Sequence, residues 1–484
     1  MSPPIRTSVP LLALAVALAS CAAVGPNFER PAAPATPGYT MTGEGGAARA
    51  ALTPDVRPAG AWWSALGSAD LDRVIREALK YSPTLAEADA LLARNQAEAD
   101  AVRGSRRPQA DANAGLTRER INTTRFGISN FPSPTATLYS VGGAVSYDLD
   151  LWGGGRRRVE QADAKTEAQA RRADAAYLSL TGEIALQAVE IAALRAEIAS
   201  AQATIDDDRR LNDIIANGIK AGGEAPPALA SGQAQAAQDE AVLPPLLRQL
   251  DVARHRLALL AGQAPGAWSA PDFELSAFSL PERIPVSLPS TLVRQRPDIL
   301  AAEADLHAAT ADIGVQTAAL YPDISLSAAL TQTARAPEDL FGYSASGWNI
   351  GGGLTAPLLH GGTLKANRRA AEAEARAAMA RYQQTVLMAF NQVADSLQAL
   401  ARDDEAIAAL SRAEAADAEN VRLAEAAYRL GGGPLYRVID ARRQLSRSRR
   451  ERVRAEGQRF QDVVRLYAAT AGGWKTAEQR TAAR

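Results

Sequence analysis

Side chains that could do chemistry are few in this chain of 484 residues, and they lie far apart. The histidines are about fifty residues from one another, so no two stand one helical turn apart as zinc ligands on a helix do. They are His255, His307 and His360. The one cysteine, Cys21, has no partner for a disulfide and cannot build a thiolate metal site. No phosphate-binding loop, dinucleotide fingerprint or nucleophile triad is present, so we expect no catalytic site, cofactor or metal.

Three charged clusters have the composition of binding sites. Asp148 and Asp150 alternate along a predicted strand and share one side of it, where we interpret them as structural. Residues 206–208 are aspartates beside two arginines and predict an exposed charge patch, with contact to a partner protein as the alternative. Residues 442–454 hold seven arginines, which in a cytosolic protein would indicate nucleic acid. The signal peptide described below predicts export, which excludes nucleic acid as the partner. The helical spacing of these arginines predicts a stripe that faces solvent or lines a lumen.

The N-terminus has the features of a lipoprotein signal peptide over residues 1–20. Arg6 precedes an apolar run at 9–19, which is too short to span a bilayer. Residues 18–21 read Leu-Ala-Ser-Cys and resemble a lipobox, in which the thiol of Cys21 is acylated and Cys21 starts the mature chain. The alternative is an ordinary cleavage site with an incidental cysteine. Ala22 in place of aspartate implies, by the same resemblance, sorting to the outer membrane.

Composition narrows the classes of function further. Fifty-three Lys and Arg balance 54 Asp and Glu, so no bulk basic field exists to hold nucleic acid. Abundant alanine with only 5% aromatic residues favours long helices. After the signal peptide no stretch reaches the ~18 consecutive apolar residues of a membrane-spanning helix. If the mature chain crosses a bilayer, it must use strands.

The chain repeats one plan twice, which indicates an internal duplication. Pro83 and Pro297 are 214 residues apart, and so are Pro108 and Pro322. Each half is predicted to hold a helix, two strands and a long helical hairpin. The expected parts are a lipid-anchored extended tether at 21–58, a first repeat at 59–263, a connecting segment at 264–290, a second repeat at 291–473 and a tail at 474–484.

Periodicity places the elements within each repeat. Alternation of polar and apolar residues predicts strand pairs at about 108–152 and 322–357, and helical patterns predict hairpins at about 156–261 and 362–471. Glycines mark the hairpin tips, with an offset of 210 residues between the Gly222-Gly223 pair and the Gly432-Gly433 pair. Within the hairpins, a long helical stretch is expected at about 156–219 and 362–430, followed by a shorter one at about 227–261 and 435–471.

Four strands of this length cannot close into a barrel, and open sheet edges in lipid would leave backbone groups unpaired. The chain must therefore assemble, and two, three or more copies satisfy the even strand count of closed barrels. The alternative is that the strands are half-buried and sit on a lipid-anchored coiled-coil periplasmic scaffold.

Seven motifs in a fixed order resemble the outer-membrane efflux protein family, the TolC-like channels, over almost the whole mature chain. The likeness is to the lipoprotein branch, the NodT type, which serves RND-type multidrug pumps. The motifs are WW at 62–63, YDLDLWG at 147–153, RQRPDI at 294–299, YPDISL at 321–326, APLLHGG at 356–362, VIDAR at 438–442 and GGW at 472–474.

This resemblance implies a mixed α and β membrane protein. Its expected form is a homotrimer with a 12-stranded outer-membrane β-barrel, four strands per chain, continuous with a long periplasmic α-helical barrel. The implied function is a passive duct for small toxic compounds or drugs in a tripartite efflux system. The implied partners are a periplasmic adaptor (membrane fusion) protein, an inner-membrane RND-type transporter and outer-membrane lipid. Ducts for protein secretion or metal ions are the alternatives.

The resemblance also assigns residues. Asp440 matches a position whose acidic ring favours cations at the periplasmic aperture, and Tyr428 matches the tyrosine that hydrogen-bonds across neighbouring hairpins. Arg437 stands where some members carry a second acid, and we expect it to pair with Asp440 at i, i+3. A solvated helix carboxylate is the alternative for Asp440. The tip glycines are expected to face the adaptor or, alternatively, only to close turns; they are Gly222, Gly223, Gly431, Gly432 and Gly433.

Overall fold

The computed structural model describes residues 23–36, 38, 39, 41, 52–54, 61–120, 122, 134–280, 284–286 and 288–470. These residues form two compact units. The first holds 23–31, Leu91–Gln169 and Ala301–Tyr382, and the second holds the remaining described residues. The expected signal peptide, Cys21 and the tail at 474–484 lie outside the described residues.

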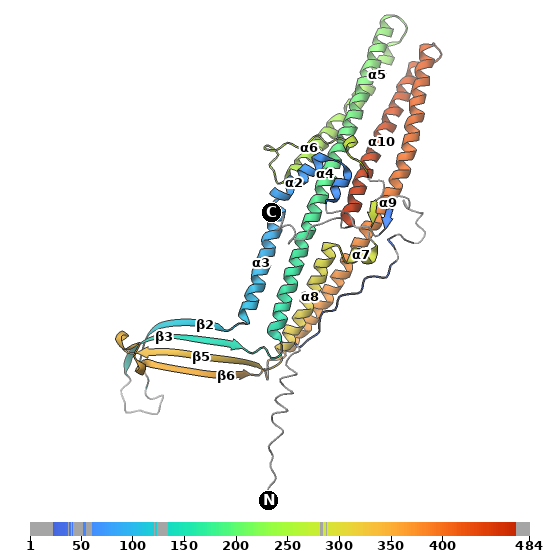
Figure 1. The fold of residues 1–484 in the computed structure, drawn as a ribbon. Coiled ribbons are helices and arrows are strands. Elements are labelled where there is room, and N and C mark those ends of the chain that lie inside the picture. The colour runs from blue at the N-terminus through green and yellow to red at the C-terminus, as the bar shows by residue number, and fades with distance from the viewer. Residues whose placement is uncertain are drawn as a thin grey trace. The chain divides into compact units, whose positions relative to one another are not determined.

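The first unit contains one antiparallel sheet of four strands in the order β2-β3-β5-β6 (Figure 1). Its centre pairs β3 with β5, so that strands from the two halves of the sequence are neighbours. Val145 lies opposite Ala328, and Ala328 lies opposite Ile350, so the register aligns the apolar positions of successive strands. The strands are β2 (Gln109–Arg120), β3 (Thr135–Asp148), β5 (Asp323–Ala334) and β6 (Ser346–Thr355), with the short 3-10 turns η4 (Pro337–Asp339) and η5 (Tyr343–Ala345) between β5 and β6.

Helix segments complete the first unit. They belong to α3 (Pro83–Ser105), α4 (Gly154–Lys220), α8 (Pro297–Ala318) and α9 (Thr363–Arg429). Both α3 and α8 begin at a proline, the residue that suits the first helical position. Their contacts rest on small residues, because Ala99, Ala168 and Ala311 are at most 1% exposed. Alanine at these positions lets the helices approach closely, which is what the alanine-rich composition provides.

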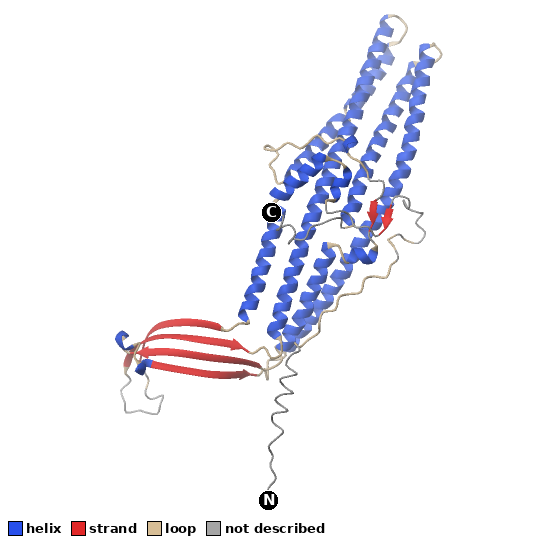
Figure 2. Ribbon diagram, viewed as in Figure 1, coloured by secondary structure: helices blue, strands red, loops and turns tan. Residues whose placement is uncertain are grey.

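The second unit is built on two helical hairpins, one of α4 with α5 (Pro226–Glu240) and one of α9 with α10 (Leu435–Ala469) (Figure 2). The second helical stretch of the first hairpin, expected at about 227–261, is divided into two helices. The first, α5, ends at Glu240, and α6 starts anew at Leu243 and runs to Leu260. Pro244 and Pro245 occupy the first turn of α6, and since proline has no backbone N–H, a continuous helix cannot pass them without losing hydrogen bonds.

Large apolar side chains fill the core of the second unit. Trp62 is 2% exposed and stacks on Tyr467 with ring centres 5.5 Å apart, so the Trp62-Trp63 motif is part of this core. The flanking elements are η1 (Trp62–Leu66), α2 (Ala69–Tyr81), η3 (Leu275–Ala277) and α7 (Pro289–Val293). A pairing that the sequence did not predict joins the expected tether to the connecting segment, because β1 (Leu52–Pro54) lies parallel to β4 (Ile284–Val286).

None of the helices within the described ranges combines the length and the apolar character that a membrane crossing needs.

Candidate functional site

The four-stranded sheet has one apolar face and one polar face. Because side chains alternate along a strand, the register places large apolar residues together on one side. Trp348 and Ile350 on this side are 75% and 78% exposed. The opposite side carries Asp111, Asp148 and Asp323 among serines, threonines and glycines. An exposed apolar face of this size marks an interaction surface, and its alternation is that of a strand with lipid on one side.

The sheet also has two open edges. Strands β2 and β6 stand at the ends of the strand order, and within the described residues each is paired on one side only. Unpaired backbone groups in lipid cost several kcal/mol each, so this sheet alone is unsuited to a bilayer. Strands from further chains would complete it.

At the junction of sheet and helices, Asp150 caps α4. Its carboxylate accepts the backbone N–H groups of Gly155 and Arg156, both at 2.8 Å, and lies 3.6 Å from the guanidinium of Arg106. A carboxylate at a helix N-terminus satisfies free N–H groups and complements the helix dipole. The expectation that Asp148 and Asp150 share a strand is wrong, because β3 ends at Asp148 and Asp150 lies in the loop before α4, which begins at Gly154.

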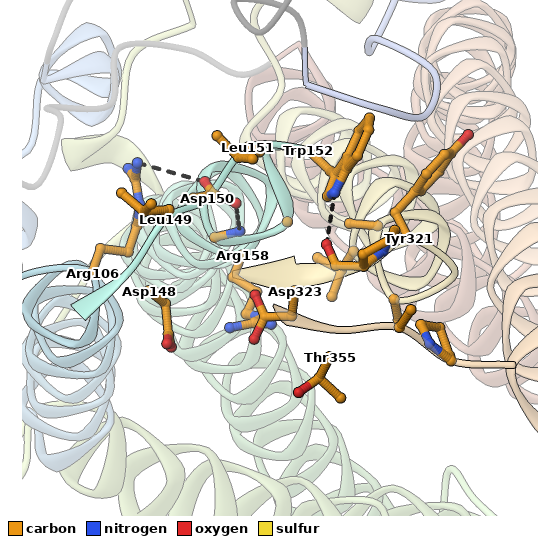
Figure 3. Close-up of a pocket in the computed structure, with 18 of the residues that line it drawn as sticks. Arg106, Asp148, Leu149, Asp150, Leu151, Trp152, Arg158, Tyr321, Asp323 and Thr355 are labelled. Atoms are coloured by element: carbon orange, nitrogen blue, oxygen red, sulfur yellow. Dashed lines mark hydrogen bonds and ion pairs between the residues drawn. The ribbon is translucent and has the colours of Figure 1, made fainter. Parts of the chain in front are cut away.

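The same junction lines a partly open cavity of about 380 Å³ (Figure 3). Trp152 and Tyr321 stack at 4.7 Å between ring centres, and the indole N–H of Trp152 donates to the carbonyl oxygen of Pro322 at 2.8 Å. Asp148 and Asp323 also line this cavity. Aromatic residues with one polar edge are typical of the boundary between membrane and water. Across the residues that the structure describes, no three His, Cys, Asp or Glu side chains gather as metal ligands would.

An extended segment at residues 23–30 docks on the helices of the first unit. Arg157 holds it, and the side chain of Arg157 is only 4% exposed. The guanidinium donates to the carbonyl oxygens of Val24 and Gly25, at 3.1 and 3.3 Å, and to the side-chain oxygen of Asn27 at 2.7 Å. The N–H of Val24 donates to the carbonyl of Trp152 at 3.0 Å. The start of the predicted tether is therefore bound to the protein.

Further contacts continue this docking. Phe28 stacks on His307 at 4.4 Å, and Arg30 pairs with the buried carboxylate of Glu303 at 2.6 Å. Glu160 accepts from Arg157 at 2.7 Å and lies 3.0 Å from Nε2 of His307. Burial opposes the ionisation of Glu160, but the hydrogen bonds from Arg157 and His307 outweigh it and lower the pKa of that carboxyl.

The predicted tip glycines close the two hairpins in the second unit. Gly222 and Gly431 have φ of +76° and +73°, the left-handed region that glycine adopts without steric cost. The N–H groups that follow them, of Gly223 and Gly432, bond back at 2.9 Å to the carbonyls of Gly218 and Ala427. Both tips are thus Schellman turns. Gly222 corresponds to Gly431 and not to Gly432, so the offset of 210 is wrong by one residue at the tips.

Tyr428 joins the two hairpins near these turns. Its hydroxyl donates to Glu224 at 2.5 Å, and this hydrogen bond is the main reason why the pKa of Tyr428 is raised. Its ring packs on an apolar cluster that draws from all four hairpin helices. The buried members of that cluster are Leu211, Ile215, Leu435 and Val438.

Asp440 points away from that cluster. It lies two residues beyond the buried Val438 on α10, its side chain is 66% exposed, and it pairs with Arg443 at 2.7 Å. The expected pair of Asp440 with Arg437 is therefore replaced by one on the other side of Asp440. Arg437 is exposed on the first turn of α10. The structure thus brings Tyr428 into the tip core and leaves Asp440 and Arg437 on the surface of the single chain.

Two charged clusters are placed differently from the sequence prediction. Arg442 binds Glu425 of α9 at 2.6 Å, and Arg449 and Arg452 both bind Glu414 of α9, so these arginines join two helices. Asp208 is only 8% exposed and is not part of a surface patch. Its spacing of three and seven residues to Leu211 and Ile215 was the signal that it faces inward.

The sheet with one apolar face, the paired helical hairpins and the glycine-closed tips define a TolC-like outer-membrane channel fold. The outer membrane protein VceC from Vibrio cholerae has this fold, with a TM-score of 0.81 and 26% identity over 86% of this chain and 100% of that chain.

Sequence comparison gives the family. The profile described as Outer membrane efflux protein matches residues 74–263 and 288–472. Outer membrane protein OprJ of Pseudomonas aeruginosa is 30% identical and covers 96% of each chain. The pyoverdine export outer membrane protein OpmQ of the same species is 28% identical over 86% of this chain and 88% of that protein. The chain belongs to the outer membrane efflux protein family, which confirms the resemblance and makes it an outer-membrane channel component and not an enzyme.

Proposed function

We propose that three copies of this chain form a closed 12-stranded barrel in the outer membrane, continuous with a periplasmic helical barrel, and act as the passive duct of a tripartite efflux system. The observation that carries the proposal is the four-stranded sheet, apolar on one face and open at both edges. Three such sheets supply an even number of strands within the range of closed barrels, and closure pairs every edge. The alternatives are a barrel built from two copies or from more than three copies, and the test below distinguishes them from a trimer.

Acylation of Cys21 would anchor each copy. The docked segment supports this part of the proposal, because Arg157 holds the chain at residues 23–27, directly after the predicted lipid attachment. A link of two residues spans at most ~7 Å, so the acyl chains would enter lipid close to the junction of sheet and helices. Acyl chains contribute about 0.8 kcal/mol for each buried methylene, and several chains on one residue make a lasting anchor.

The hairpin tips would receive a periplasmic adaptor, which in turn joins an inner-membrane RND-type transporter. Leu430 and Tyr436 flank the second tip and are 86% and 64% exposed, which supports apolar docking at that end. Gly432 between them presents bare backbone, which a partner helix could approach closely. The cargo proposed is a small toxic organic compound, and the relative named as the toluene efflux pump outer membrane protein TtgI of Pseudomonas putida, 27% identical over 70% of this chain, supports this. The alternative cargoes are secreted proteins and metal ions.

The periplasmic aperture would be formed where the tips of three copies meet. Three Asp440 carboxylates around one axis would attract cations, and Arg437 beside them would weaken that preference. The hydrogen bond of Tyr428 to Glu224 supports a role in holding the two hairpins of one copy together at this end.

The decisive experiment is the native mass of the full-length protein purified from membranes in mild detergent, together with a Cys21→Ala form. We expect a trimer in both forms, and we expect the Cys21→Ala form still to require detergent, because the apolar sheet face remains. A detergent-independent monomer from Cys21→Ala would overturn the barrel and favour a lipid-anchored scaffold. Another closed oligomer would refute the count of twelve strands but keep the duct.

A further inference from the structure

Two pairs of acidic side chains lie between the helices of the hairpins, and nothing in the proposed function uses them. The first acid pair is Asp208 of α4 with Asp239 of α5, which are 8% and 7% exposed. Their carboxyl groups lie within hydrogen-bonding reach of each other. Gln235 donates to one oxygen of Asp239 at 2.7 Å and Arg450 lies 3.4 Å from the other, whereas Oδ2 of Asp208 has no partner among the described residues. Two buried carboxylates with one cation cannot both remain ionised at low cost.

The charges around the first acid pair come from three further positions. On α10, Arg450 forms an ion pair with Asp239 at 3.4 Å. Arg442 of the same helix forms an ion pair with Glu425 of α9 at 2.6 Å. On α4, Asp207 pairs with Arg210 at 3.4 Å and adds negative charge beside Asp208. The balance is one available guanidinium for two carboxyl groups. Burial and the negative charge of Asp239 accordingly raise the pKa of Asp208 to about 7.

The second acid pair repeats this arrangement in the other hairpin. Asp403 of α9 faces Asp462 of α10, which is 5% exposed. Asp462 accepts from Gln458 at 3.0 Å and from Arg465 at 2.5 Å, and Oδ2 of Asp403 is buried with no hydrogen-bond partner in the described part of the chain. The neighbouring Asp404 is paired with Arg459 at 2.6 Å. Burial and the charge of Asp462 raise the pKa of Asp403 to about 6.

We propose that each acid pair is a proton-dependent clasp: a carboxylic proton on Asp208 or Asp403 bonds the two helices of its hairpin, and loss of that proton places two like charges between them and loosens the hairpin. The clasp acts within one chain and is independent of the strand count of the barrel. It makes the helical hairpins firmer in mildly acidic surroundings than in alkaline ones.

The direction follows from linkage. A carboxyl whose pKa is higher in the folded hairpin than in an opened one binds more protons when folded, so the hairpin loses stability as pH rises toward the folded value and then levels off. Between pH 6 and pH 8, a folded pKa of about 7 predicts an increase of about tenfold in the opening constant of the first hairpin. A folded pKa of about 6 predicts about a twofold increase for the second hairpin.

The test is amide hydrogen exchange of the full-length protein in detergent, read as protection factors at pH 6 and pH 8 after correction for intrinsic exchange rates. For peptides from residues 200–240 we expect protection to fall about tenfold in the parent. In Asp208→Asn, which keeps a neutral group at both pH values, this fall should vanish. Asp206→Asn is the matched control, since Asp206 is exposed, pairs with Arg209 at 3.7 Å and is not among the charges that shift the pKa of Asp208, and it should behave as the parent.

Asp239→Asn supplies an independent variant. Removing the partner's charge should lower the pKa of Asp208, although burial continues to raise it, so the fall in protection between pH 6 and pH 8 should become smaller than in the parent. Asp403→Asn should remove only the smaller, twofold change in peptides near residues 395–465. The clasp is overturned if the parent shows no fall between pH 6 and pH 8, or if Asp208→Asn retains the full fall of the parent.

Discussion

Replacing Arg157 by alanine should release the N-terminal segment while leaving the helices in place. The side chain of Arg157 is 4% exposed and donates to three groups of residues 24–27 and to Glu160. Hydrogen bonds from a charged donor contribute about 1.5–3 kcal/mol each, but the released carbonyl groups regain water. We count the full hydrogen bond to Asn27 and only part of those to the carbonyl oxygens. On this basis the free energy that favours the docked segment should fall by about 3 kcal/mol. This equals an increase of about a hundredfold in the fraction of detached segment.

Limited proteolysis measures this fraction. The side chain of Glu29 is exposed, but its backbone is held by the contacts of its neighbours Phe28 and Arg30. A glutamate-specific protease must therefore act on the detached form of the segment. The cleavage rate then follows the opening equilibrium when reclosing is faster than cleavage. We expect a rise of about two orders of magnitude in Arg157→Ala, a smaller rise in Arg157→Lys, and no change in the exposed neighbour control Arg158→Ala. Equal cleavage of the parent and Arg157→Ala would refute the docking role.

Four further predictions concern the tips. Gly431→Ala should destabilise the second turn by about 1–2 kcal/mol, because alanine is strained at a φ of +73°, whereas Gly432→Ala should leave thermal stability unchanged. A bulky residue at Gly432 should lower drug resistance without lowering trimer yield; unchanged resistance would remove the adaptor from that glycine. Tyr428→Phe should cost about 1 kcal/mol through the lost bond to Glu224, and single-channel conductance should rise if that bond restrains the aperture. Asp440→Ala should raise conductance or reduce cation preference in planar bilayers, and identical currents in variant and parent would contradict an acidic ring.

Local patterns predicted those parts of the fold that depend on neighbouring residues. Alternation within residues 108–152 indicated a pair of strands, and the structure has β2 and β3 there. The prolines at 83 and 297 marked helix starts for the same reason, since proline fits only the first turn. The parallel pairing of Leu52–Pro54 with Ile284–Val286 had no local signal, because three-residue strands carry too little periodicity and their partners are far apart in sequence.

The site residues divide in the same way. The glycine tips could be read from composition, yet the exact correspondence of Gly222 with Gly431 depended on φ angles that no sequence offset records. Asp208 was misassigned because its charged neighbours suggested a surface patch, whereas its spacing to Leu211 placed it inward. The docking role of Arg157 was invisible, because its partners at residues 24–27 lie more than a hundred positions earlier in the chain.

The close approach of Gly25 to α8 constrains two positions that are far apart in the sequence, Gly25 and Gly314. A Cβ atom at Gly25 would lie 2.5 Å from the Cα of Gly314, and one at Gly314 would lie 2.7 Å from Cγ of Arg157. Neither glycine can therefore gain a side chain while the segment stays docked. A side chain at Gly25 would collide with the backbone of α8, and one at Gly314 would displace the Arg157 side chain that holds the segment, so docking constrains both positions. Insertions for labelling or display are accordingly best placed away from residues 23–30. Even a single methyl group added at Gly25 would prevent this segment from packing on α8.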